Sequence, residues 1–189
     1  METTAEMFGI GLTVVTELEP FGDATLVEAA RDGDQDAFHR LYALYSRMVH
    51  GLLLARVPPG EVDDLMQDVF LTAYTRLRSL RDPSAFGGWL AMIARNRAHD
   101  YHRHYREPVE LPEDLAVQDA PEAEARQVLA VVQSLPEAYR ETLILRLAEG
   151  MTGPEIAERT GLKPASVRVN LHRGMKQLRQ KLERRSAHA

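Results

Sequence analysis

The feature that most constrains this chain is the stretch from Leu135 to Leu182, where three residues have the spacing of a helix-turn-helix unit. Ala157 is followed four residues later by Gly161 and, after six more, by Val167. The small side chain of Ala157 lets two helices approach, Gly161 permits the positive φ of a tight turn, and Val167 fills the gap between the helices. This spacing predicts two helices that meet at a tight corner.

The start of each of these helices is also marked in the sequence. Thr152 and Glu155 have the spacing of a capping box, and Pro154 falls inside the first turn that follows. Pro164 occupies the favoured first position of the second helix. We therefore expect the first helix to begin after Thr152 and the second to begin at Pro164.

The second helix has two chemically different faces. At about 100° per residue, one face is apolar and points towards a core; it contains Val167, Leu171, Met175, Leu178 and Leu182. The other face contains Ala165, Arg168, Val169, His172, Arg173 and Lys176. From Lys163 to Arg185 there are eight Lys or Arg residues against the single Glu183. An ordinary amphipathic helix with a solvated basic face would also fit this charge, but charge, capping box and Ala/Gly/Val spacing together favour a helix that enters the major groove of DNA.

The composition limits the other possibilities. The 189-residue chain has room for one large or two small domains, and strand-like alternation is hard to find, which predicts an all-α protein. It has no cysteine, which excludes disulfides and Cys-ligated zinc and fits a cytoplasmic location. No apolar run approaches the roughly 20 residues of a membrane span, and no basic segment precedes the apolar patch near the N-terminus, so neither membrane insertion nor a signal peptide is expected.

The formal net charge of −5 is unusual for a DNA-binding protein, but the charges are segregated. Residues 1–36 contain nine acidic residues and only one arginine, and residues 107–125 contain seven acidic residues and no Lys or Arg. The basic residues gather in residues 95–106 and in the C-terminal helix. Two basic patches joined by an acidic connector predict two nucleic-acid contacts, with acidic segments that repel DNA when the protein is alone.

Turn residues and apolar periodicity divide the chain into segments. We expect a disordered tail over 1–22, one helical domain over 23–106, a flexible acidic linker over 107–122 and a second helical domain over 123–185. Within the domains the expected helices are 24–31, 35–57, 61–80, 85–106, 123–133 and 137–149, followed by the helix-turn-helix, with Asp23, Asp34 and either Asp82 or Ser84 as N-caps.

Three helices of the first domain have a regular pattern of side chains. The buried positions of the second helix are Phe38, Leu41, Tyr42, Tyr45, Met48, Val49 and Leu52, and those of the third are Val62, Leu65, Met66, Val69, Ala73 and Leu77. Asp63, Asp64, Gln67 and Asp68 then face outward, where acids near a helix start also favour the helix dipole. In the fourth helix Arg95, Arg97, Arg103 and Arg106 alternate with Tyr101 and Tyr105, a pattern typical of phosphate contact with base stacking, although a solvated basic helix end has the same composition.

Four blocks in this order resemble the extracytoplasmic-function (ECF) sigma factors, the minimal class of sigma-70-type initiation subunits of bacterial RNA polymerase. DAFHRLYALYSRMV resembles the start of region two, VDDLMQDVFLTAYTRL its polymerase-binding helix, and FGGWLAMIARNRAHDYHRHYR the part that melts and reads the −10 element. The stretch from Leu135 to Leu182 resembles region four, which reads the −35 element. The resemblance covers nearly everything from Leu26 to Leu182 and implies two domains, region two over 23–106 and region four over 123–185.

The resemblance also implies roles for individual residues. Contacts with core polymerase fall on Asp64, Leu65, Gln67, Asp68 and Phe70. Contacts with the −10 element, including a pocket for a flipped base at 79–85, fall on Ser79, Arg81, Asp82, Ser84, Trp89, Arg95, Asn96, Arg97 and Arg103. Contacts with the −35 element fall on Lys163, Ser166, Arg168, Val169, His172, Arg173 and Lys176. The expected partners are core RNA polymerase, promoter DNA and an anti-sigma factor; no cofactor, metal or catalytic residue is expected.

This chain departs from the family pattern at three places in region four. Lys163 stands where a small capping residue is usual, Val169-Asn170 replaces a small polar and a basic residue, and Gly153-Pro154 replaces a bulky or acidic one. Val169 offers contact with a thymine methyl group, and Asn170 offers one phosphate contact fewer. The preferred promoter sequence is therefore expected to be this protein's own.

Two other classes of protein remain open on the residues alone. A stand-alone helix-turn-helix regulator needs only the last ~55 residues and leaves the two-helix acidic block and the helix from Trp89 to Arg106 unexplained. An enzyme with a metal site is conceivable from His99, His102 and His104, but on one helix only His99 and His102 share a face, and no nucleophile–base motif or phosphate loop accompanies them.

Overall fold

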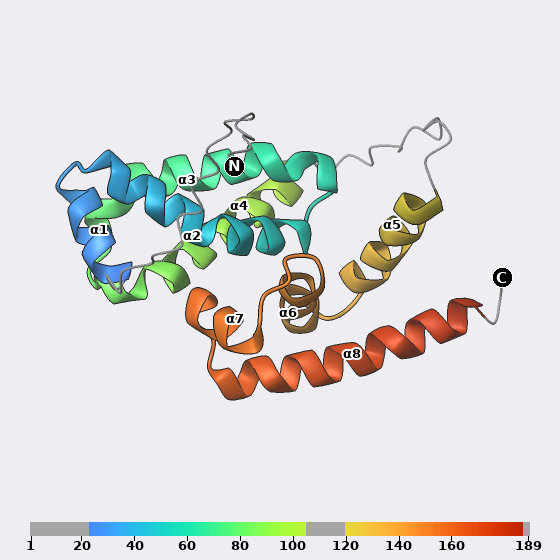
Figure 1. Cartoon of the computed structure of the whole chain (residues 1–189). Helices are drawn as coiled ribbons and strands as arrows, with labels where there is room; N and C mark the ends of the chain where they lie inside the picture. The colour runs from blue at the N-terminus through green and yellow to red at the C-terminus, as the bar shows by residue number, and fades with distance from the viewer. Residues whose placement is uncertain (1–22, 105–119, 187–189) are drawn as a thin grey trace, which may run out of the picture.

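The computed structural model describes residues 23–104 and 120–186, and within these ranges the chain is helical with no strand. The N-terminal domain (residues 23–104) and the C-terminal domain (residues 120–186) each contain four α-helices (Figure 1). The helices are α1 (Asp23–Arg31), α2 (Gln35–Leu54), α3 (Val62–Arg76), α4 (Phe86–His104), α5 (Ala120–Gln133), α6 (Glu137–Leu147), α7 (Gly153–Thr160) and α8 (Pro164–Ser186). The predicted all-α, two-domain fold is confirmed; the expected tail at 1–22 and most of the acidic linker lie outside the described residues.

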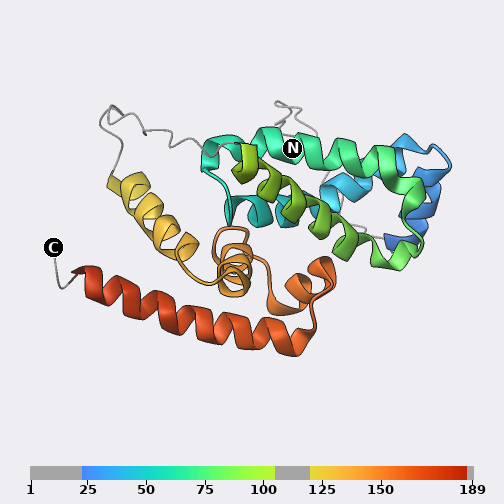
Figure 2. The ribbon, with the colours of Figure 1, turned by 180° about the vertical axis from the view of Figure 1, so that it is seen from behind.

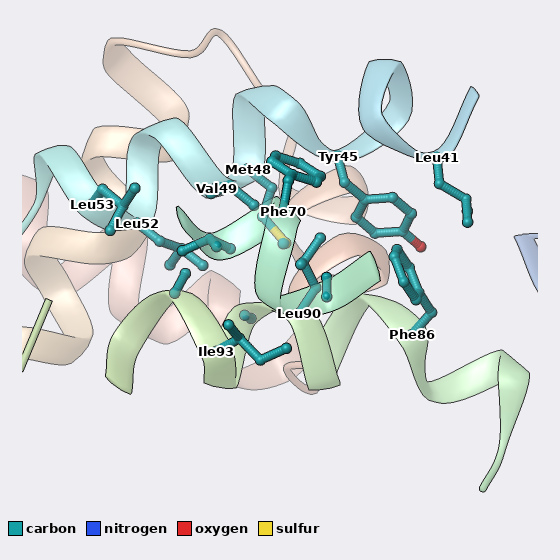
Figure 3. Close-up of a cluster of buried hydrophobic side chains, with 14 of the residues drawn as sticks. Leu41, Tyr45, Met48, Val49, Leu52, Leu53, Phe70, Phe86, Leu90 and Ile93 are labelled. Atoms are coloured by element: carbon teal, nitrogen blue, oxygen red, sulfur yellow. The ribbon is translucent and has the colours of Figure 1, made fainter. Parts of the chain in front are cut away.

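The core of the N-terminal domain is formed where α2, α3 and α4 face one another. In Figure 3, Met48 of α2 lies beside Phe70 of α3 and Leu90 of α4, and Tyr45 of α2 faces Phe86 of α4. Phe86 and Leu90 are fully buried, and the ring of Phe86 lies edge-on to Tyr45 with centroids 5.0 Å apart. Burial of these apolar faces is the main favourable term that holds α4 in place.

The start of α2 agrees with the sequence and its end does not. Asp34 is the N-cap, since its Oδ1 accepts a hydrogen bond from the backbone N–H of Ala37 at 3.1 Å. The helix was predicted to reach Val57 but ends at Leu54. Val57 precedes Pro58, and the proline ring disfavours the helical conformation of the residue before it.

Helix α3 is also shorter than predicted, because its last turn tightens into a 3-10 helix at Leu77–Ser79. Two aromatic positions differ from the expected stripes. Tyr42 was predicted to be buried but is 40% exposed, whereas Phe70, 4.5 Å away between ring centroids, is 5% exposed. The tyrosine hydroxyl stays in water while the phenylalanine ring fills the core.

Helix α4 begins at Phe86, and a 3-10 turn at Pro83–Ala85 leads into it. Asp82 caps this turn, as predicted, by accepting hydrogen bonds from the backbone N–H and hydroxyl of Ser84 at 2.9 and 2.7 Å. Asp23 was predicted to cap α1, but α1 begins at Asp23 itself. The Asp23 carboxylate instead accepts hydrogen bonds from Tyr45 and Arg159.

In the C-terminal domain the predicted helix-turn-helix is confirmed in detail. The capping box of Thr152 and Glu155 is formed in both directions, and Gly161 has φ +71° at the end of α7. Helix α6 ends at Leu147, two residues before its predicted end, and α5 begins at Ala120, three residues before its predicted start. Gly150, with φ +64°, then turns the chain towards α7.

One predicted core position on α8 is wrong. Met175 is 39% exposed, whereas Gly174 beside it is buried against α6. A Cβ atom at Gly174 would lie 3.0 Å from Leu143 Cδ1 and 3.2 Å from Tyr139 Cβ. The absent side chain lets α8 approach α6 closely, and this rotates Met175 off the buried face.

The two domains pack directly against each other. Figures 1 and 2 show α6 and α7 between the N-terminal domain and the long α8, which runs along the outer side of the C-terminal domain. Leu145 of α6 and Ile156 of α7 are fully buried and belong to the same apolar cluster as the core of α2 and α4. A second cluster, around Leu143, Val132 and Leu178, lies mainly in the C-terminal domain and also contains Ala55, which follows α2. We call this packed arrangement of the two domains the closed arrangement.

Candidate nucleic-acid and partner interfaces

The corner between α7 and α8 holds the outer face of α8 away from the core. Val167 is 1% exposed and Ala157 is 7% exposed, so both lie between the two helices as the spacing predicts. The backbone N–H of Leu162 donates to Thr160 Oγ1 at 3.3 Å, which fixes the turn next to Gly161. The direction of α8 is therefore set by apolar packing and turn chemistry together.

The face of α8 that was predicted to contact DNA is open to solvent. Every residue assigned to the −35 element is exposed, namely Lys163, Ser166, Arg168, Val169, His172, Arg173 and Lys176. Arg168, Val169, His172 and Arg173 together line a shallow hollow on this face. Their positions fit direct readout of bases, since Arg can donate two hydrogen bonds to one guanine and Val can contact a thymine methyl group.

The outward face of α3 is acidic. Asp64, Gln67 and Asp68 are exposed, whereas Leu65 is half-buried and packs on the core. Phe70 does not join this face, because its ring lies inside the domain. Its contact with core polymerase stays a prediction.

Two exposed apolar residues beside these acids were not predicted. Leu71 is 63% exposed and Tyr74 is 45% exposed. Leu71 follows Asp64, Gln67 and Asp68 at helical spacing, and Tyr74 follows Gln67 by seven residues, so periodicity alone places all of them on one face. The face therefore combines carboxylates with an apolar contact surface.

The residues assigned to the −10 element are divided between a loop and α4. Ser79, Arg81, Asp82 and Ser84 are exposed in or beside the loop, and the two hydrogen bonds from Ser84 lower the pKa of Asp82. On α4, Asn96 and Arg103 are exposed, and Arg103 pairs with Asp100 at 3.1 Å. Six of the nine assigned residues are therefore exposed, four of them in or beside the loop and two on α4.

Three residues of this group are held by the protein itself. Trp89 is half-buried, with its ring centroid 6.0 Å from that of Phe86. Arg97 donates from Nη2 to Thr72 Oγ1 at 2.9 Å. Arg95 donates to both carboxylate oxygens of Glu141 in α6, at 2.9 and 3.1 Å, so the structure places it in an ion pair between the domains.

Glu141 is a residue that sequence reasoning missed. Its side chain is 7% exposed and also accepts a hydrogen bond from Arg56 of the N-terminal domain. Burial would raise the pKa of Glu141, but the hydrogen bond from Arg95 and the charges of both arginines outweigh it and lower the pKa. Nothing in the sequence around Glu141 distinguishes it from the other acids, because its partners are 46 and 85 residues away.

A second ionic contact joins α2 to Glu149, two residues after the end of α6. His50 Nδ1 lies 2.6 Å from Glu149 Oε1, and Arg47 donates to the backbone carbonyl of Glu149. The pKa of His50 is raised, first by the hydrogen bond with Glu149 and further by the charges of Glu149 and Asp63, against a lowering by burial. Protonation of His50 therefore strengthens the contact between the domains.

A third ionic contact joins α1 to α7. Arg159 Nη1 lies 3.0 Å from Asp23 Oδ2, and its guanidinium stacks over the ring of Tyr45 at 4.9 Å from the centroid. Burial, followed by the hydrogen bond to Asp23, raises the pKa of the Tyr45 hydroxyl, which stays protonated and donates to that carboxylate. The three ionic contacts lie at separate places along the interface.

The histidines of α4 are not brought together around a common point. His102 Nε2 lies 2.8 Å from the backbone carbonyl of Arg56, and His104 Nδ1 lies 2.8 Å from that of Asp100. Within residues 23–104 and 120–186, no group of three or more His, Cys, Asp or Glu residues is arranged to hold a metal ion. No helix in these ranges is long and apolar enough to cross a membrane.

Comparison with known proteins gives consistent matches over both domains. Residues 41–107 match the family model described as Sigma-70 region 2, and residues 125–178 match Sigma-70, region 4. The chain is 35% identical over 166 residues to RNA polymerase sigma factor CarQ of Myxococcus xanthus, covering 82% of this chain and 95% of that protein. It is 33% identical over 184 residues to the ECF RNA polymerase sigma-E factor of Haemophilus influenzae, covering 87% and 97%.

Two solved structures have a similar fold. CnrH, in complex with the cytosolic domain of CnrY, superposes with a TM-score of 0.61 at 27% identity, covering 86% of this chain and 97% of that one. The sigma factor RpoE, in complex with the anti-sigma factor NepR from Bartonella quintana, superposes with a TM-score of 0.53 at 19% identity, covering 79% and 98%. The second likeness concerns the fold alone.

Proposed function

Since the chain belongs to the ECF group of sigma-70-type RNA polymerase sigma factors, we propose that it binds core RNA polymerase through α3 and reads two promoter elements with α4 and α8. It confers promoter specificity on the polymerase and carries out no covalent chemistry itself. It acts in the cytoplasm, where RNA polymerase and the chromosome are.

The contact with core polymerase is assigned to the exposed face of α3. Asp64, Gln67 and Asp68 match the family's polymerase-binding helix, which docks on the clamp helices of the largest catalytic subunit. Leu71 and Tyr74 add exposed apolar area on the same face. A docking surface with an apolar centre and charged neighbours excludes water from its middle while the charges set orientation.

The −35 element is assigned to α8. Arg168 and Arg173 are exposed on the outer face of the helix, where a guanidinium can donate to two acceptors of a guanine. Val169 is 40% exposed beside them and offers an apolar surface to a thymine methyl group. Lys163 and Lys176 flank this group and supply sequence-independent contact with phosphates.

The −10 element is assigned to the loop at 79–85 and to the exposed side of α4. Extruding a base from the duplex costs a few kcal/mol, which stacking and hydrogen bonding in a pocket offset. The hydroxyls of Ser79 and Ser84 and the guanidinium of Arg81 provide exposed polar groups in or beside this loop. Asn96 and Arg103 continue the same surface along α4 and would lie against the unpaired strand.

Control by an anti-sigma factor is the third part of the proposal. CnrH, which is 27% identical to this chain, was solved with the cytosolic domain of CnrY bound. We assign to this chain a partner of the same class, which would bind the surfaces that core polymerase needs. The exposed apolar residues of α3 provide one such surface.

The observation that supports the proposal is that the residues assigned to core polymerase and those assigned to the −35 element lie mainly on exposed faces of two separate helices, α3 and α8. A stand-alone helix-turn-helix regulator uses the second face and leaves the first without a role. Fluorescence anisotropy of a labelled promoter duplex, measured with and without core polymerase, separates the two functions. We expect specific binding to require core enzyme; tight and specific binding by the protein alone would favour the regulator.

A further inference from the structure

The closed arrangement places one buried carboxylate between two arginines of the other domain. Arg95 donates from Nε to Glu141 Oε1 at 2.9 Å and from Nη2 to Oε2 at 3.1 Å. Arg56, whose side chain is 6% exposed, also donates to Oε1. Two parallel hydrogen bonds from one guanidinium are the geometry with which arginine recognises a carboxylate or a phosphate.

We propose that Glu141 is an internal substitute for a DNA phosphate, which occupies Arg95 in the free protein and is displaced when the −10 strand binds. The inference rests on the proposed function, which assigns the helix of Arg95 to that strand. The carboxylate takes the Nε and Nη2 donors of Arg95. A phosphate that needs these donors cannot bind while Glu141 holds them, so strand binding and domain closure compete.

The exchange of partners is feasible because it leaves no charge buried and alone. A buried carboxylate without its arginines would be strongly unfavourable, as would a buried arginine without its carboxylate. Separation of the domains exposes Glu141 and Arg56 to water and gives Arg95 to the phosphate. In the closed arrangement all three charged groups are therefore paired, and after separation Glu141 and Arg56 are hydrated while Arg95 is paired with the phosphate.

The remaining interface is built so that the two surfaces fit closely and can separate. Its ionic contacts are His50 with Glu149, Asp23 with Arg159 and Arg56 with Glu137, and water can hydrate all of these groups once the domains separate. A glycine, Gly51, faces α6, and a Cβ atom there would lie 2.7 Å from Leu145 Cδ2. Glycine in the middle of a helix is unfavourable compared with alanine, so its presence here coincides with the close approach of the other domain.

Competition has a reciprocal consequence. If closure weakens strand binding by some factor, strand binding must weaken closure by the same factor, and such couplings typically amount to about 5- to 150-fold. The acidic tail and linker were the sequence-based candidates for masking the basic patches; they lie outside the described residues. The structure supplies a different acid, Glu141, on a helix of the C-terminal domain.

The test uses the full-length chain, which has no cysteine and accepts dyes at two introduced ones. Thr25 of α1 and Glu158 of α7 are exposed, and the Asp23–Arg159 pair holds these helices together, so dyes on T25C and E158C report closure by energy transfer. Strand binding is measured in parallel with unlabelled protein and an oligothymidylate of about 12 nucleotides, since phosphate contacts carry no sequence information.

We expect Glu141→Gln to lower energy transfer and to raise affinity for the oligothymidylate about tenfold at fixed salt. The matched control is Glu137→Gln, the same change one turn earlier on α6. Glu137 also pairs with Arg56, but its side chain is 62% exposed, so affinity should stay within about twofold of wild type. In wild type, added oligothymidylate should lower energy transfer. Unchanged affinity for Glu141→Gln despite reduced energy transfer would overturn the proposal.

A second variant covers the case in which Glu141→Gln does not fold. Gly51→Leu places a side chain against Leu145 and leaves Arg95 and Glu141 intact. Like Glu141→Gln, it should lower energy transfer and raise affinity for the oligothymidylate. Reduced energy transfer with unchanged affinity would show that the closed arrangement does not block the strand site. Core-dependent transcription by wild type is measured alongside: its absence would refute the proposed function, whereas its presence without any effect of these variants would refute only the competition.

Discussion

Two leucines of α6, two residues apart and both fully buried, have different structural roles. Leu143 lies with Val132 and Leu178 in the second cluster, whose other buried members, apart from Ala55, also come from the C-terminal domain. Leu145 lies in the apolar cluster that joins the domains and faces Gly51 of α2. The same substitution at the two positions therefore separates the stability of the domain from the stability of the closed arrangement.

The expected size of the effect follows from burial. Truncating a buried leucine to alanine costs roughly 2–5 kcal/mol, depending on how far the cavity collapses. At about 0.05–0.15 kcal/mol per residue, a domain of this size has a free energy of unfolding of roughly 3–10 kcal/mol. Leu143→Ala should therefore remove a large part of the C-terminal domain's stability, whereas Leu145→Ala should mainly weaken contact with α2, a loss that ends once the domains separate.

Urea unfolding followed by circular dichroism, together with energy transfer between dyes on α1 and α7, measures both effects. With m of about 1–3 kcal/mol/M, Leu143→Ala should lower the urea midpoint of the C-terminal domain by roughly 1–2 M and leave closure intact below the transition. Leu145→Ala should lower energy transfer and shift that midpoint by less than half as much. Equal midpoint shifts with unchanged energy transfer would show that Leu145 belongs to the domain's own core and that the interface reasoning is wrong.

Three further predictions concern single contacts. Arg173→Ala should reduce run-off transcription from −35-dependent promoters by the equivalent of about 1–3 kcal/mol and leave core binding unchanged. Arg179→Ala on the same helix is the control and should change neither transcription nor core binding. Loss of core binding by Arg173→Ala would mean that this residue has a structural role. Thr152→Ala should cost about 1 kcal/mol and lower the melting temperature of the C-terminal domain by roughly 4–8 °C, with Thr152→Ser as the control that keeps the cap. The pKa of His50 is raised above its ordinary value of 6.5, so its ion pair with Glu149 is fully effective below that value and is lost as pH rises through the raised pKa. Closure should therefore decrease as pH rises above 6.5 in wild type and should not show this decrease in His50→Gln.

Local signals in the sequence were sufficient for most of the fold. The capping box at Thr152 and Glu155, the positive φ of Gly161 and the cap at Asp34 each depend on residues within a few positions of one another. Such patterns have one favourable local geometry, so tertiary contacts did not change them. The exposed face of α8 followed from the same periodicity.

The corrections concern positions where neighbours from elsewhere in the chain decide the outcome. Phe70 is buried and Tyr42 is exposed because the ring without a hydroxyl fills the core of the bundle. Met175 is displaced by the close approach of α6 at Gly174. Helical periodicity gives the direction of each side chain, but it does not distinguish between two apolar residues at the edge of a stripe.

The relation between the domains had no signal in the sequence. Arg95 was assigned to DNA from its basic and aromatic neighbours, and nothing near it indicates a partner 46 residues away. Glu141 is one acid among 28 Asp and Glu residues in the chain. Ion pairs between distant residues follow from packing, which local pattern and charge counts do not contain.

Transcription with core polymerase on a promoter library tests the central claim most directly. Core RNA polymerase is incubated with the library with and without the protein, and transcript start sites are mapped. We expect new transcripts that depend on the protein and start at a fixed distance from two shared upstream elements, one for α4 and one for α8. No new start sites with core enzyme, together with specific binding of the same DNA by the protein alone, would contradict assignment of these two helices to promoter initiation.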